Sequence, residues 1–184
     1  MITLNSDAAS TSLSKTTKAI LNEYGIKLNK NLGQNYLIDR NKRDQIIQFG
    51  NLTKDDVVLE IGPGIGTLTI ELAKRVKKVI AIEQDSNICQ ILENRLKKEN
   101  IDNVELINDD ALNVEFPKFD KIISNLPYQI SSPITFKFLN YDFQLAILMY
   151  QKEFASRMNG KVGSKDYSRL SAMLYFCLLY TSDA

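Results

Sequence analysis

The fold of this chain is decided by the stretch Val57-Val58-Leu59-Glu60-Ile61-Gly62-Pro63-Gly64-Ile65-Gly66-Thr67. An apolar run rich in β-branched residues is typical of a buried strand, and here it stops at a turn that holds three glycines. A helical pattern of apolar residues follows, at Leu68, Ile70, Leu72, Ala73 and Val76. A strand, a glycine turn and a helix in this order can hold a nucleotide-like ligand at the helix N-terminus.

The spacing of the glycines narrows the choice of ligand. A dinucleotide-binding G-x-G-x-x-G loop starting at Gly62 needs glycine at position 67, where this chain has threonine. Pro63 also removes a backbone N–H that could donate to a pyrophosphate. The pattern E-x-G-x-G-x-G instead resembles the glycine loop of class I S-adenosylmethionine (SAM) methyltransferases. A nicotinamide oxidoreductase is therefore the weakest alternative, and a glycine-rich turn without a ligand stays open.

Size and composition indicate one globular domain. The chain has 184 residues, of which 44% are hydrophobic and 24% are charged. No apolar run reaches the roughly 18–20 residues of a membrane span, and the first residues lack the pattern of a signal peptide. Cys89 and Cys177 are far apart in sequence and are expected as free thiols, which favours a cytoplasmic protein without a membrane anchor.

The absence of histidine limits the possible chemistry. Without histidine the chain has no His general base, no Ser-His-Asp triad and no His-ligated metal site, and we expect no metal. The net charge is +1, so any surface that binds nucleic acid has to be local.

Strand and helix patterns alternate through most of the chain. This alternation predicts a doubly wound parallel sheet of the α/β class. Helices are expected at 15–24, at 40–49 after an Asp39 cap, and from a Ser132 cap with Pro133 at the first helical position. The expected strands cover residues 57–61, 78–83, 103–108, 121–124 and 144–150, the last of them fully buried.

Two carboxylates follow predicted strands at positions suited to an adenosine-containing ligand. Glu83 comes twenty-one residues after Gly62, where a carboxylate can accept both ribose hydroxyls. Asp110 follows the third strand and can accept from the exocyclic amine of adenine. Asp109 is the competing candidate, and a surface turn is the alternative for both aspartates.

Asn125-Leu126-Pro127-Tyr128 is the sharpest chemical signal. It directly follows the fourth strand, at the carboxyl edge where ligands bind in open α/β sheets. The Asn125 side chain and the Leu126 carbonyl offer two acceptors for an NH₂ group, and Tyr128 offers a ring face for a base. A β-turn with a core tyrosine is the alternative.

Four motifs in this order resemble the ribosomal RNA adenine N6-dimethyltransferase family, of the KsgA type with the Erm methylases as relatives. The resemblance spans roughly residues 27–172 and implies a class I, Rossmann-like SAM-dependent methyltransferase domain at 27–184, after a leader and helix at 1–26. It implies a SAM site lined by Asn35, Leu37, Gly62, Gly64, Glu83, Asp110 and Asn125. The family also has a C-terminal helical domain that is missing here, so we expect a C-terminally incomplete sequence. The motifs are 30–37, 60–64, 125–128 and 151–155.

The expected activity is methyl transfer to N6 of adenine in small-subunit ribosomal RNA, with Asn125, Leu126 and Tyr128 as catalytic residues. Dimethylation, a role in ribosome biogenesis and a monomeric state follow from the resemblance. Phosphate contacts are expected at Lys161, Lys165 and Arg169. A SAM-binding ribosome-assembly factor without catalysis, and an N6-adenine or glutamine methyltransferase with another substrate, remain as alternatives.

Overall fold

The computed structural model describes residues 13–25 and 37–177. Five strands form one parallel sheet in the order β3-β2-β1-β4-β5. The strands are β1 (Val57–Ile61), β2 (Lys78–Glu83), β3 (Val104–Asn108), β4 (Lys121–Asn125) and β5 (Leu145–Met149). The helices are α1 (Leu13–Glu23), α2 (Arg40–Phe49), α3 (Thr69–Ala73), α4 (Ser86–Lys98), the 3-10 turn η2 (Tyr128–Ile130), α5 (Ser131–Phe138), α6 (Lys152–Met158) and α7 (Arg169–Cys177).

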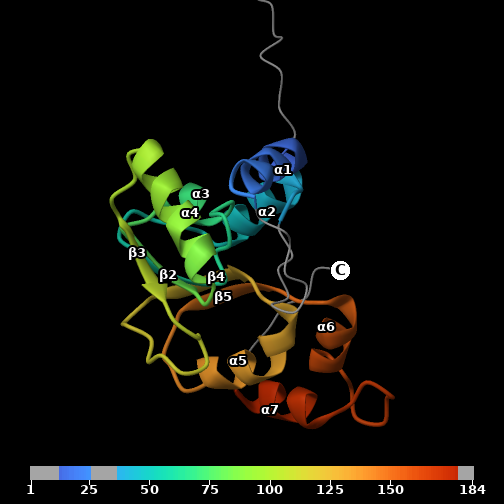
Figure 1. The fold of residues 1–184 in the computed structure, drawn as a ribbon. Coiled ribbons are helices and arrows are strands. Elements are labelled where there is room, and N and C mark those ends of the chain that lie inside the picture. Colours follow the sequence, from blue (N-terminus) through green and yellow to red (C-terminus); the bar gives the residue numbers. More distant parts are fainter. Residues whose placement is uncertain (1–12, 26–36, 178–184) are drawn as a thin grey trace, which may run out of the picture.

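Helices cover both faces of the sheet, as a doubly wound fold requires (Figure 1). Successive residues of a strand point to opposite faces, so β1 contributes Val58 to one apolar core and Leu59 to the other. The first core packs against α2 and α3, and the second against α5. The predicted α/β class and parallel sheet are therefore confirmed.

The sheet has its switch point between β1 and β4. From β1 the chain proceeds outward through β2 and β3, and it then returns to place β4 on the other side of β1. The β1–β4 ladder pairs only Val58 with Lys121 and Leu59 with Ile122. Beyond it, the Ile61 N–H donates to the buried hydroxyl of Ser124 at 2.8 Å. A side chain thus replaces a strand carbonyl at the edge where ligands bind in such sheets.

The opposite edge of the sheet is held by a buried ion pair. Nζ of Lys121 lies 2.9 Å from Oδ2 of Asp56, and it also donates to the Asn51 carbonyl at 2.7 Å. The Thr53 N–H donates to the same carboxylate at 2.6 Å. Burial alone would raise the pKa of Asp56, but the hydrogen bonds from Thr53 and Lys121 lower it below its usual value.

Two local expectations from the sequence were wrong. Ser132 does not cap a helix, because the turn Tyr128–Ile130 runs directly into α5, which begins at Ser131. Pro133 still lies in the first turn of α5, where its missing N–H leaves no helical bond unmade. β5 is half-buried along its length, because among the strands in residues 13–25 and 37–177 it pairs with β4 alone and forms an edge of the sheet. Asp39 does cap α2, as expected.

Candidate functional site

The glycine turn packs closely against the segment that follows β4. Gly62, Gly64 and Gly66 all have positive φ, between 55° and 84°. A Cβ on Gly62 would lie 2.9 Å from Cγ of Pro127, closer than real side chains approach. Glycine at 62 therefore allows the turn after β1 and the segment after β4 to touch.

Glu83 ends β2 and links the glycine turn to the start of α4. Its Oε2 accepts from the Gly64 N–H at 3.2 Å, and its Oε1 accepts from the Asp85 N–H at 3.1 Å. Burial raises the pKa of Glu83, and these two hydrogen bonds partly offset the rise. A carboxylate has about four acceptor positions, so these two hydrogen bonds do not use all of them.

Asp110 begins a single helical turn after β3. Its Oδ1 accepts from the Leu112 N–H at 2.9 Å and its Oδ2 from the Asn113 side chain at 3.3 Å. Asp109 bends back instead, and its Oδ1 accepts from the Asp110 N–H at 2.7 Å. The side chain of Asp110 is thus held in place by the turn that it caps.

Asn125 is the last residue of β4, opposite Met149 of β5. Leu126 is 1% exposed and anchors the following segment in the core shared with α5. Tyr128 is half-buried and opens the 3-10 turn that leads into α5. The structure therefore fixes this segment through a buried leucine and through Pro127 against Gly62.

Glu60 is a buried acid in β1 for which the sequence analysis assigned no role. It is 2% exposed, and its Oε2 has no hydrogen-bond partner within the described ranges. Burial is the main cause that raises its pKa to about 8. The nearby Thr69 hydroxyl moderates this rise and the charge of Glu83 adds to it. The glycine turn therefore lies directly after a carboxyl group that favours its protonated form at neutral pH.

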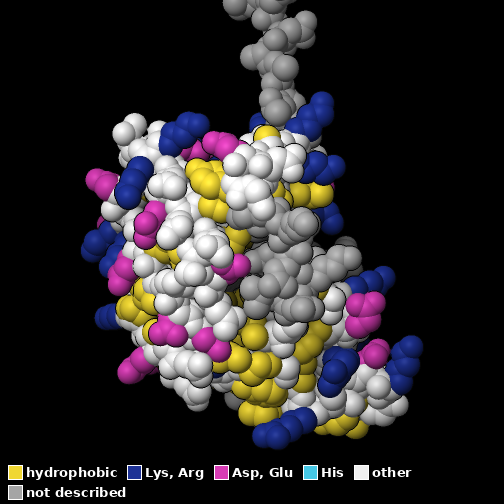
Figure 2. Space-filling model, in the orientation of Figure 1, with side chains coloured by type: hydrophobic (Ala, Val, Ile, Leu, Met, Phe, Trp, Pro, Cys, Tyr) yellow, Lys and Arg dark blue, Asp and Glu magenta, His cyan; other side chains and the backbone are white. Residues whose placement is uncertain are grey.

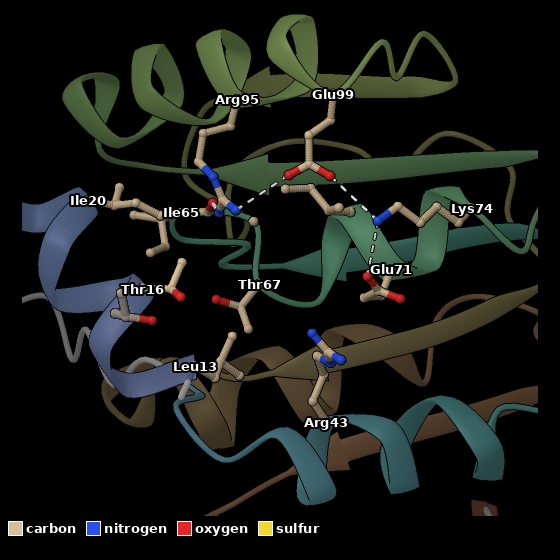
Figure 3. Close-up of a pocket in the computed structure, with 13 residues that line it drawn as sticks. Leu13, Thr16, Ile20, Arg43, Ile65, Thr67, Glu71, Lys74, Arg95 and Glu99 are labelled. Carbon is tan, nitrogen blue, oxygen red and sulfur yellow. Dashed lines mark hydrogen bonds and ion pairs between the residues drawn. The ribbon is translucent and has the colours of Figure 1, made fainter. Parts of the chain in front are cut away.

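The helix α1 packs over the outer side of the glycine turn. Leu21 of α1 belongs to a small core with Ile65 of the turn. Arg95 of α4 donates to the Ile65 carbonyl, and burial lowers the pKa of its guanidinium. A cavity of about 150 Å³ lies here, with Thr16 of α1 and Thr67 among its lining residues (Figure 3). This cavity lies behind the glycine turn rather than at the carboxyl edge of the strands.

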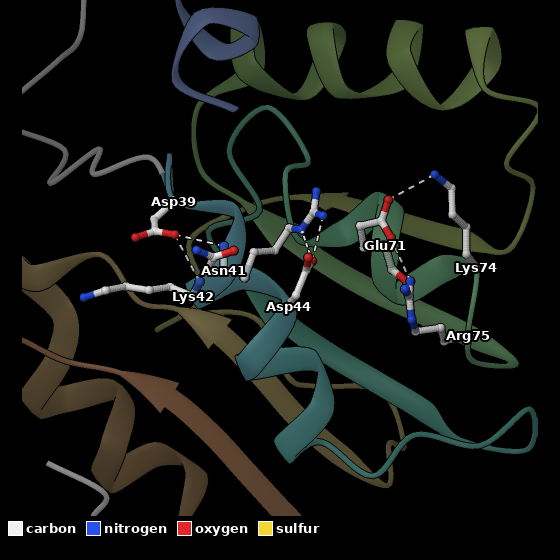
Figure 4. A network of polar contacts seen from close by, with 8 residues as sticks. Asp39, Asn41, Lys42, Asp44, Glu71, Lys74 and Arg75 are labelled. Atoms are coloured by element: carbon white, nitrogen blue, oxygen red, sulfur yellow. Dashed lines mark hydrogen bonds and ion pairs between the residues drawn. The ribbon is translucent and has the colours of Figure 1, made fainter. Parts of the chain in front are cut away.

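Surface ion pairs surround this region. Lys74 pairs with Glu71 at 3.1 Å and Arg75 pairs with Glu71 at 2.8 Å (Figure 4). Lys74 also lies 3.5 Å from Glu99 (Figure 3). Arg43 of α2 forms an ion pair with Asp44, the next residue in the chain. These contacts join partly exposed side chains, so each contributes little to stability. The charged side chains around the cavity therefore have partners within the protein, and their presence is no evidence for a ligand there.

The predicted RNA contacts lie together on the loop from α6 to α7. Lys161 and Lys165 are exposed on this loop, and Arg169 is exposed at the start of α7. Basic side chains are visible on this part of the surface (Figure 2). The two ends of this loop approach each other closely at Gly160. A Cβ there would lie 2.4 Å from the Asp166 carbonyl oxygen, so only glycine fits at this position.

The structure thus brings most predicted site residues to one edge of the sheet. Gly62, Gly64, Glu83, Asp110 and Asn125 all stand at or just after the carboxyl ends of β1 to β4. Leu37 is 8% exposed and packs in the core beside α2, and Asn35 lies outside the described residues. Ser124 and Glu60 were missed, although a polar residue inside an apolar strand is a signal that could have found both.

Two features are absent from the described residues. These residues contain no cluster of three or more Cys, Asp or Glu side chains that could hold a metal ion. Among the helices in these ranges, none has the length and apolar character to cross a membrane.

Comparison with known proteins finds similarity to a single protein family. The model of the family "Ribosomal RNA adenine dimethylase" matches residues 25–179. Proteins named "Probable ribosomal RNA small subunit methyltransferase A" from Methanothermobacter thermautotrophicus and Methanosphaera stadtmanae are 56% and 57% identical over 160 residues. Those matches cover 87% of this chain but 58% and 59% of the relatives. The chain therefore spans about six tenths of the length of these relatives.

Solved structures agree with this comparison. A dimethyladenosine transferase from Plasmodium falciparum has a TM-score of 0.68 and 43% identity, over 72% of this chain and 49% of that one. The 23S rRNA methyltransferase ErmE has a TM-score of 0.67 and 34% identity, over 77% and 57%. The fold is that of class I SAM-dependent methyltransferases.

Proposed function

The chain belongs to the ribosomal RNA adenine dimethylase family, and from this membership we propose that it methylates N6 of adenines in small-subunit ribosomal RNA. The observation that carries the proposal is the contact between Gly62 and Pro127. It brings the proposed cofactor turn against the segment with the proposed acceptors for the target amine. The proposed cofactor site and the proposed site for the target amine therefore meet at the β1–β4 switch point, where ligands bind in sheets of this kind.

Membership of the family implies SAM as the cofactor, and the residues present fit it. Gly62 and Gly64 carry no side chain that would keep a ligand from the backbone of the turn, and Glu83 is a carboxylate that could accept from ribose hydroxyls. Asp110 would accept from the adenine amine, and the resemblance adds Asn35 and Leu37. When bound, SAM supplies a methyl group on a positively charged sulfur, which makes the methyl electrophilic.

The chain's own part in the reaction is to position the target nitrogen. An adenine amine is a poor nucleophile because its lone pair is delocalised into the ring. Acceptors at the Asn125 side chain and the Leu126 carbonyl would hold both N–H bonds and favour a pyramidal nitrogen. Tyr128 would stack on the base, and in-line geometry would supply much of the acceleration. Such a site needs no strong base before attack, which suits a chain without histidine.

The RNA would lie against Lys161, Lys165 and Arg169 through its phosphates. Such contacts give affinity with little sequence choice, so selection of the adenines would come from RNA shape. We further propose that residues 27–184 act as the catalytic domain of a cytoplasmic monomer that works on the small ribosomal subunit during its biogenesis.

The test measures transfer of tritiated methyl groups from SAM to small ribosomal subunits that lack the modification. Asn125→Ala should abolish transfer while SAM binding, measured by calorimetry, is weakened but detectable. Lys118→Met, at an exposed position away from the site, is the matched control and should behave as the wild type. Wild-type turnover in Asn125→Ala would refute the assignment. Normal assembly of subunits with the Asn125→Ala chain would separate an assembly role from catalysis.

A further inference from the structure

Lys137 of α5 is a cation turned inward onto the backbone of another segment. Its Nζ donates to the carbonyl oxygens of Ala111 at 2.8 Å and Leu112 at 3.1 Å, and also to that of Val114. An ammonium group has three donors, so all three are used. Nζ also lies 4.4 Å from the ring centroid of Phe116, within the range of a cation–π contact.

The segment that receives these bonds is the turn that begins at Asp110. The Asp110 carbonyl accepts from the Asn113 and Val114 N–H groups at 2.8 and 3.1 Å, which forms one helical turn. A helix leaves its last carbonyls without N–H partners, and in this single turn no further helix supplies them. Lys137 provides the missing donors and fixes the turn from its C-terminal side.

Asp110 is thereby held from two directions. Its carboxylate caps the turn through Leu112 N–H, while Lys137 draws the carbonyls of the same turn toward α5. α5 follows directly after the Asn125 segment, so Lys137 links the proposed adenine contact to the proposed catalytic segment.

We propose that Lys137 is a positioning residue that fixes Asp110 for recognition of the exocyclic amine of the cofactor's adenine. This inference rests on the proposed function, because it takes the adenine end of the SAM site to lie at Asp110. It assigns Lys137 a role in selectivity, since a displaced Asp110 would no longer distinguish a purine that carries the amine from one that lacks it. A lysine that only stabilised the fold would affect both ligands equally.

The experiment compares two ligands that differ at this one group. S-adenosylhomocysteine and its analogue with unsubstituted purine in place of adenine are titrated into the full chain by isothermal calorimetry. We expect the wild type to prefer the first by at least about tenfold, the value of one hydrogen bond to a charged group. In Lys137→Met, which keeps the length of the side chain, the preference should fall to within about threefold, mainly through loss of S-adenosylhomocysteine affinity.

Two further variants control the result. Lys118→Met removes an exposed lysine and should keep the wild-type preference. Lys137→Arg keeps the charge, but a planar guanidinium cannot direct three donors at three carbonyls of one turn, so the preference should fall here too. This variant carries the test if Lys137→Met unfolds.

Other results would count against the inference or against the proposed function on which it rests. An unchanged preference in both Lys137 variants, or equal weakening of the two ligands, overturns the inference. A wild type that binds both ligands equally overturns it and leaves the methyltransferase proposal standing. A wild type that binds neither ligand counts against the proposed function itself.

Discussion

Glu60→Gln should make the protein more stable in alkaline solution and leave its stability almost unchanged in acid. Glu60 is 2% exposed in β1, and burial raises the pKa of its carboxyl from 4.5 to about 8. Between these two values the native state holds a proton that the unfolded chain has released. Stability therefore falls as the pH rises through this window, because folding must take up that proton or bury a charge.

The size of the effect follows from the two pKa values. They differ by about 3.5, and at about 1.4 kcal/mol for each pKa unit the loss by pH 8 is about 5 kcal/mol. This is an upper bound, because a charged carboxylate admits water and local rearrangement. Glutamine has nearly the shape of the protonated acid and no charge, so it should avoid this loss.

The assay is urea unfolding followed by circular dichroism at half-unit steps from pH 5 to pH 9. The difference in unfolding free energy between Glu60→Gln and the wild type isolates the contribution of Glu60. We expect it near zero at pH 5 and several kcal/mol in favour of the variant above pH 8. Glu93→Gln, an exposed glutamate on α4, should stay within about 0.5 kcal/mol of the wild type throughout. A difference that does not vary with pH would refute the reasoning.

Three further predictions address the frame of the site. Lys121→Met should lower the free energy of unfolding, measured in urea, by about 3 to 5 kcal/mol, because it leaves the Asp56 carboxylate buried without its cation. This ion pair lies at the opposite edge of the sheet from the proposed site, so a change in the affinity of the folded variant for S-adenosylhomocysteine would contradict the account. Gly62→Ala should weaken binding of that ligand and lower stability by about 1 to 2 kcal/mol, because φ is +67° and the new Cβ would press on Pro127. Arg95→Met should weaken the same binding in calorimetry by freeing the Ile65 carbonyl, and an unchanged affinity would show that the glycine turn holds its shape without α4.

Residues whose environment follows from the local pattern were predicted correctly from the sequence. β1 and β2 have the expected bounds, because each is an apolar run that ends at a turn or a charged residue. The placement of Glu83 and Asn125 at one edge of the sheet follows from the same alternation, since parallel strands end on the same side. Their roles toward SAM and RNA remain predictions.

Residues whose environment depends on distant segments could not be predicted in this way. Lysine is normally exposed, so nothing in the local sequence indicates that Lys137 crosses to the carbonyls of residues 111–114 or that Lys121 pairs with Asp56. The start of α5 was misplaced for the same reason. The contact of Pro127 with Gly62 fixes where the chain leaves β4, and η2 then runs directly into the helix.

Ser124 explains how the sheet leaves room for the proposed site between β1 and β4. A full ladder would occupy the backbone groups of both strands up to their carboxyl ends, as it does between β1 and β2, where Ile61 pairs with Ile82. The β1–β4 pairs instead end at Leu59 and Ile122, and the Ser124 hydroxyl takes the N–H of Ile61. The serine thus satisfies a buried donor that would otherwise require a strand carbonyl, and β1 and β4 can part without leaving the Ile61 N–H unpaired. Gly62 stays bonded to β2 through its N–H and the Ile82 carbonyl, and Asn125 stays paired with β5. The proposed cofactor turn and the proposed catalytic amide can therefore occupy the same edge.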